Sequence, residues 1–110
     1  MFRAHLRPAI ALAAYAGLRA GEVRGLRWKD VNVASGALFI RQALTHGQPV
    51  APKSGHERFV PISGALKPHL EVAKARPHQP SDPVAPSQKG PPWTDAGLRS
   101  AFRRALSGRR

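Results

Sequence analysis

The sequence predicts an α+β fold that is mainly helical, with helices packed on a small antiparallel β-sheet of two or three strands. Apolar residues recur every three or four positions near both ends of the chain, as on the buried face of a helix. Short β-prone runs separated by turn-forming residues occupy the middle of the chain, between residues 37 and 62. With 110 residues, the chain is long enough for one domain with a thin core.

Two helical segments are expected first, within residues 7–31. Apolar residues at helical spacing predict a helix over residues 7–16, and Gly17 is suited to end it. A shorter helix then carries Glu22 in its first turn, where a carboxylate suits the positive end of a helix.

The middle of the chain, residues 37–62, is expected to form the sheet. Residues 37–42, 50–52 and 58–62 are short, extended pieces, and residues 53–56 have the composition of a turn between the last two. A small antiparallel sheet is the simplest assembly of these pieces.

The last third of the chain predicts two helices joined by a connector. Ser63 is suited to cap a helix over residues 63–76. Residues 77–92 hold six prolines among polar residues, which predicts an exposed connector with no packed element. Thr94 is suited to cap a basic amphipathic helix over residues 94–107.

The charge balance points to nucleic acid. Eighteen Lys and Arg against six Asp and Glu give a formal charge of +12, which a polyanion would offset. The five histidines lack metal-site spacing, so neither a metal nor another cofactor is expected. The absence of cysteine fits a reducing cytoplasm, and the most apolar stretch, residues 9–18, is too short to cross a membrane.

Arg19 is the strongest candidate for chemistry. It follows the Gly17 turn and precedes a short helix, and this frame would hold its guanidinium in place. A guanidinium offers two parallel donors to phosphate oxygens, and preorganised donors stabilise the charge that develops during phosphoryl transfer. Glu22, three residues on, is placed to orient Arg19 or to accept hydrogen bonds from neighbouring amides. An ordinary surface ion pair is the plain alternative for these two residues.

The run Gly-Leu-Arg-Ala-Gly-Glu at residues 17–22 and the run Lys-Ser-Gly-His-Glu-Arg-Phe-Val-Pro at residues 53–61 together resemble the tyrosine recombinase (phage integrase) family. The resemblance covers the first half of that family's catalytic domain. It implies that Arg19 is the first active-site arginine, that Lys53 protonates the leaving 5′ oxygen, and that Glu22 supports Arg19. Lys53 would lie in the turn of a β-hairpin, where its alternative is a solubilising role.

Five further residues are predicted to contact DNA because they lie beside Lys53 or on the basic face of the last helix. They are His56, Arg58, Arg99, Arg103 and Arg104. A solvated turn histidine is the alternative for His56.

The family's remaining catalytic residues are not found in this sequence. A tyrosine recombinase also needs an arginine in a His-x-x-Arg motif, a later His or Trp, and a nucleophilic tyrosine. Tyr15 is the only tyrosine, and it lies where the family has a packing residue. The expected function is therefore a truncated, DNA-binding recombinase fragment of DNA integration and recombination, inactive alone, with double-stranded DNA as its partner and a homodimer or the missing half as a second one.

Two other readings of the sequence are open. A small RNA-binding or ribosome-associated protein without catalytic activity would suit the basic charge, although few aromatic residues are present to stack on bases. A fragment that folds only in part, with no function of its own, is the other.

Overall fold

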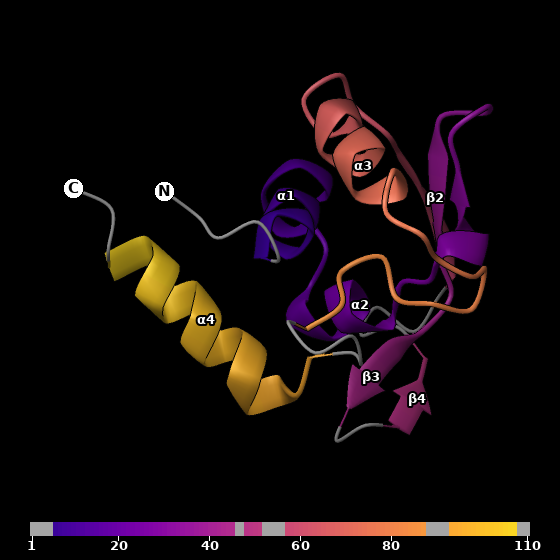
Figure 1. Cartoon of the computed structure of the whole chain (residues 1–110). Helices are drawn as coiled ribbons and strands as arrows, with labels where there is room; N and C mark the ends of the chain where they lie inside the picture. The colour runs from indigo at the N-terminus through magenta and orange to yellow at the C-terminus, as the bar shows by residue number, and fades with distance from the viewer. Residues whose placement is uncertain (1–5, 46–47, 52–56, 88–92, 108–110) are drawn as a thin grey trace.

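The computed structural model describes residues 6–45, 48–51, 57–87 and 93–107, and these confirm an α+β fold (Figure 1). The helical elements are α1 (Arg7–Ala16), α2 (Ala20–Gly25), the 3-10 turn η2 (Trp28–Asp30), α3 (Lys67–Lys74) and α4 (Asp95–Ser107). The strands are β1 (Val31–Asn32), β2 (Ala37–Ile40), β3 (Ala43–Thr45), β4 (Gln48–Val50) and β5 (Arg58–Pro61).

Helix α1 ends at a left-handed glycine. Gly17 has φ 70° and ψ 24°, a left-handed conformation that is unfavourable for a residue with a Cβ atom and readily adopted by glycine. Ala9 and Leu12 are fully buried on the inner face of the helix. The chain then reverses into α2, which packs against α1.

The strands form two sheets, whereas one was expected. In the first, β2 lies between β1 and β5, and both pairs are antiparallel. Leu38 and Ile40 of β2 are buried, as the alternation of a half-buried strand requires. The second sheet is the β3–β4 pair, which lies below α2 in Figure 1. Strand β3 packs against α2, and this contact draws the chain away from the first sheet after Ile40.

Helix α3 is shorter than the predicted range of residues 63–76. The Ser63 hydroxyl accepts a hydrogen bond from the Leu66 amide at 3.1 Å, so it caps a turn that precedes the helix. The helix itself begins at Lys67, with Pro68 in its first turn. An amide hydrogen there would have no partner within the helix, so its absence in proline does not weaken the helix. Leu70 and Ala73 are buried, and α3 packs against α1.

Part of the proline-rich connector packs into the core, whereas an exposed segment was expected. Its described part, residues 77–87, passes over α2 in Figure 1. Val84 and Ala85 are 1% and 0% exposed. The Val84 amide donates to the Leu26 carbonyl at 3.0 Å, and the Trp28 amide donates to the Asp82 carbonyl at 3.1 Å. Proline composition rules out a helix here, but it does not prevent two apolar residues from entering the core.

Helix α4 begins at a capped N-terminus. The Thr94 hydroxyl accepts a hydrogen bond from the Gly97 amide at 3.0 Å. Leu98 and Ala101 are buried, and α4 packs against α2. One core thus joins all four α-helices, the first sheet and the connector; its buried members include Leu12, Val23, Leu38, Ile40, Leu66, Leu70, Val84 and Leu98.

Candidate functional site

Arg19 lies at the N-cap of α2 with an extended backbone (φ −74°, ψ 158°). Its amide donates to the Glu22 carboxylate at 3.1 Å, and its carbonyl accepts from the Val23 amide at 2.9 Å. The preceding residue, Leu18, is buried in the core. The backbone is therefore held on both sides, while the Arg19 side chain is exposed. Within the described ranges, no carboxylate lies at ion-pair distance from its guanidinium.

Glu22 is a buried carboxylate, 1% exposed, that joins α2 to β5. Both of its oxygens accept hydrogen bonds from the Arg58 guanidinium, at 2.8 and 3.0 Å, in a bidentate pair. The hydrogen bonds from Arg58 hold the pKa of Glu22 below its usual value, and the Arg19 amide acts in the same direction, whereas burial opposes them. Glu22 thus fixes the backbone of Arg19 and the start of β5 together.

Arg58 was predicted to contact DNA, and two of its nitrogens face Glu22 in the structure. The carboxylate raises the pKa of Arg58, whose side chain keeps 35% of its surface exposed. Sequence reasoning missed this ion pair because the partners are 36 residues apart. One signal was available in the sequence. Arg58 and Val60 lie two residues apart and therefore on the same face of a strand, and a cation on a partly buried face needs an anion.

Lys53 and His56 lie outside the described residues, so their predicted roles stay predictions. Strand β5 begins at Arg58, two residues after His56. The Glu22–Arg58 pair therefore connects the strand that follows residues 52–56 to the helix that follows Arg19.

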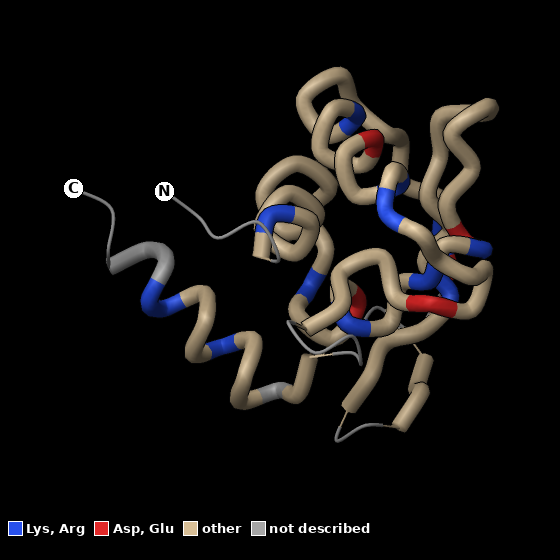
Figure 2. Tube along the Cα trace, in the orientation of Figure 1, with Lys and Arg blue, Asp and Glu red and all other residues tan. Residues whose placement is uncertain are grey.

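The three arginines predicted on the last helix, Arg99, Arg103 and Arg104, are all exposed on α4. The opposite face of the helix holds the buried Leu98 and Ala101. Figure 2 shows Lys and Arg on all four α-helices, with acidic residues at far fewer places. Among the described acids, Glu22 and Asp30 are buried and both are paired, Glu22 with Arg58 and Asp30 with Arg41, whose Nε lies 2.9 Å from Asp30. An excess of positive charge therefore remains on the surface.

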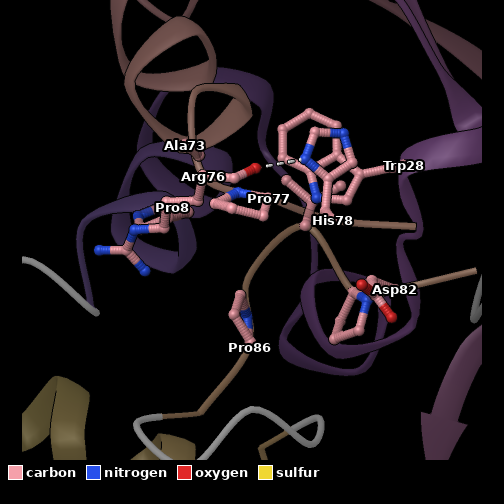
Figure 3. Close-up of a pocket in the computed structure, with 10 residues that line it drawn as sticks. Pro8, Trp28, Ala73, Arg76, Pro77, His78, Asp82 and Pro86 are labelled. Atoms are coloured by element: carbon pink, nitrogen blue, oxygen red, sulfur yellow. Dashed lines mark hydrogen bonds between the residues drawn. The ribbon is translucent and has the colours of Figure 1, made fainter. Parts of the chain in front are cut away.

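A cavity of about 300 Å³ lies between η2, α3 and the connector, away from the predicted residues (Figure 3). Trp28 stacks on His78 there, with ring centroids 4.4 Å apart, and Arg76 and Asp82 also line it. His78 Nδ1 lies 2.7 Å from the Arg76 carbonyl oxygen. Most of the other lining residues are prolines, so the cavity offers few polar groups to a ligand.

Neither a metal site nor a membrane-spanning helix is found in the part of the chain that the structure describes. No three His, Asp or Glu side chains there are grouped to hold an ion. No described helix is long and apolar enough to cross a bilayer.

Residues 2–109 match the Phage integrase family. The Tn1549 transposon integrase, solved in complex with a circular intermediate DNA, superposes with a TM-score of 0.75 at 20% identity, over 92% of this chain and 36% of that one. A lambda integrase dimer bound to a COC′ core site gives 0.67 at 22% identity, over 98% and 38%. A lambda integrase tetramer bound to a Holliday junction gives 0.64 at 22% identity, over 96% and 30%.

At these identities the solved structures show a shared fold, and this chain spans between 30% and 38% of their length. No curated protein matches the chain.

Proposed function

Since this chain belongs to the phage integrase family, we propose that it binds duplex DNA and holds the Arg19 guanidinium against a backbone phosphate in site-specific recombination. The environment of Arg19 supports this most directly. Its backbone is fixed by Glu22 and the α2 cap, and its side chain is exposed. A guanidinium held in advance can stabilise the charge of a phosphoryl-transfer transition state without reorganisation. Lys53 is proposed to protonate the leaving 5′ oxygen.

Fluorescence anisotropy with a labelled duplex tests the role of Arg19. Replacing Arg19 with Ala is expected to weaken binding about tenfold, the effect of one charge-assisted bidentate contact. The matched control is Arg76→Ala, which removes an exposed arginine two residues after α3. Equal losses in the two variants would mean that only net charge matters and would contradict the proposal.

Arg99, Arg103 and Arg104 of α4 are proposed as additional phosphate contacts. Because each neutralised phosphate releases counterions, the slope of log K against log salt should fall by about 0.9 for every contact removed. The triple Arg→Gln variant is therefore expected to reduce the slope by about 2 to 3. Lys29→Gln with Lys67→Gln and Lys74→Gln makes the same charge change at other exposed positions. An unchanged slope in the α4 variant would remove this helix from the interface.

These 110 residues, tested alone, are proposed to bind DNA without cleaving it. The sequence holds neither a His-x-x-Arg motif nor a tyrosine other than Tyr15. Tyr15 is 48% exposed and stacks on His69 with ring centroids 5.5 Å apart. A nicked DNA substrate traps any covalent protein–DNA adduct that a nucleophile forms. With this chain, no adduct is expected. An adduct that disappears in Tyr15→Phe would identify a nucleophile and overturn this part of the proposal.

More than one copy is proposed to bind one DNA duplex, because lambda integrase is solved as a dimer and as a tetramer on DNA. Light scattering of the DNA complex should give a mass above one chain per duplex.

We also propose that the protein acts on DNA in the cytoplasm. Tighter binding to single-stranded RNA than to duplex DNA would instead favour an RNA-binding protein.

A further inference from the structure

An aromatic pair lies on the outer face of the first sheet. Leu38 and Ile40 of β2 are buried in the core, so the alternation of the strand turns Phe39 outward. Phe59 of β5 is the cross-strand partner of Phe39, and the two rings stack with centroids 4.8 Å apart. Phe59 is 72% exposed, more than any other large apolar side chain among the described residues.

This aromatic pair already carries one cation. The Arg41 guanidinium lies over the Phe39 ring, 4.6 Å from its centroid, while the Arg41 Nε bonds to the buried Asp30. The face of an aromatic ring is negative and attracts a guanidinium or an ammonium group. Phe59 offers a ring of the same kind, and in the described part of the chain no cation covers it.

An exposed acid lies next to the aromatic pair in the chain. Glu57 directly precedes β5 and is two residues before Phe59, the spacing that puts two side chains on one face of a strand. No Lys, Arg or His of the described residues lies at ion-pair distance from Glu57. A carboxylate beside an exposed aromatic ring is complementary to a cation and repels a phosphate. This face is therefore suited to an arginine or lysine side chain.

We propose that the face made of Phe39, Phe59 and Glu57 receives an exposed arginine or lysine from a second copy of this chain on the same DNA duplex, an inference that rests on the proposed function. The chain holds 18 Lys and Arg, so a copy supplies the required cation. Helix α4, which carries the exposed Arg99 and Arg103, lies on the opposite side of the molecule from β2 (Figure 1). The contact therefore joins two different surfaces of neighbouring copies.

The strength of such a contact determines where it can act. A cation over an exposed ring, together with an exposed ion pair, changes an equilibrium constant by about tenfold. That is too little to hold two free chains together against the repulsion of their +12 charges. Two copies on one duplex are at a high effective concentration, and the DNA phosphates offset their charge. The contact is therefore expected to appear as cooperative DNA binding.

Anisotropy titrations of the full 110-residue chain on two labelled duplexes test this contact. One duplex is short enough to take a single chain, and the other is twice as long. On the longer duplex, the second copy should bind about tenfold more tightly than the first. Phe59→Leu keeps an apolar side chain but removes the ring, so it should abolish this cooperativity and leave affinity for the short duplex unchanged. Phe59→Tyr keeps the ring and should keep the cooperativity.

The acid has a matched control of its own. Glu57→Gln should lower the cooperativity about threefold, as expected for one exposed ion pair. Glu71→Gln makes the same charge change at an exposed position on α3 and should leave the cooperativity unaltered. Equal losses in the two variants, or full cooperativity in Phe59→Leu, would overturn the contact.

Two further outcomes separate this inference from the proposed function. Weaker binding of Phe59→Leu to the short duplex would mean that the face contacts DNA itself, and it would overturn the contact between copies. Wild-type binding to both duplexes without cooperativity would overturn this inference alone. Wild-type binding to neither duplex would overturn the proposed function and this inference with it.

Discussion

Glu22 is a buried carboxylate whose negative charge is balanced from two directions. Its oxygens accept two hydrogen bonds from Arg58 and one from the Arg19 amide. Because Arg58 belongs to β5 and Arg19 to the cap of α2, a single side chain determines how the first sheet meets the candidate site. Removing its charge would leave a partly buried guanidinium without its anion.

Glu22→Gln is expected to lower the free energy of unfolding by about 2 kcal/mol. The amide keeps the shape of the side chain but loses one acceptor and the charge, and the 35% exposure of Arg58 keeps the loss moderate. Urea denaturation at pH 7 measures it. Glu71→Gln, on the exposed side of α3, should change stability by less than about 0.5 kcal/mol. Equal effects of the two changes would contradict the role given to Glu22.

The stability of the wild type should also depend on pH through Glu22. Its pKa in the folded state is lower than in the unfolded chain, chiefly because Arg58 bonds to the carboxylate. The stabilisation is therefore complete above about pH 4.3, the ordinary pKa of a glutamate, and is lost as the pH falls through the folded-state value. The stability difference between the wild type and Glu22→Gln should shrink over that range. A difference that stays constant down to pH 3 would exclude this linkage.

Among the elements, α1 shows what local sequence can predict. Its apolar spacing and the glycine after it indicated residues 7–16, and the helix has those bounds. The start of α3 was placed four residues too early, because Ser63 caps a turn as readily as a helix. Strand β3 was missed because its three residues are too short to show an alternation, and its position depends on packing against α2.

Gly17→Ala is expected to destabilise the protein by about 1 to 2 kcal/mol. Gly17 is in the left-handed region, and no atom lies within 4 Å of the position of an added Cβ, so the backbone alone accounts for the cost. The control is Gly64→Ala, which also meets no atom within 4 Å and has no positive φ. Thermal unfolding compares the two. A loss of the same size at both glycines would mean that the end of α1 has no special requirement.

At the scale of the whole molecule, the core depends on a segment whose composition did not predict packing. The buried residues Val84 and Ala85 come from the proline-rich connector, and backbone hydrogen bonds join it to residues 26–29. Likewise, the Glu22–Arg58 pair joins positions that local patterns treat separately. Contacts of this kind depend on the three-dimensional path of the chain, which is why the sequence predicted the fold class but neither of these contacts.

Val84→Ala is expected to cost about 2 kcal/mol in the free energy of unfolding, because it removes apolar volume from a filled core. Val72→Ala makes the same chemical change at a position on α3 that is 49% exposed, and its cost should be under about 0.5 kcal/mol. Chemical denaturation of both variants measures the difference. Similar values would mean that the connector contributes little to stability.

The packing of the connector also sets limits on how such a protein can be cut and rejoined. A boundary drawn at the prolines, as domain boundaries often are, would separate Val84 from the Leu26 carbonyl to which its amide bonds. Chimeras between integrases should therefore exchange residues 20–30 and 77–87 as one unit. A flexible glycine–serine replacement of residues 77–87 would leave an opening over α2 where those side chains had been.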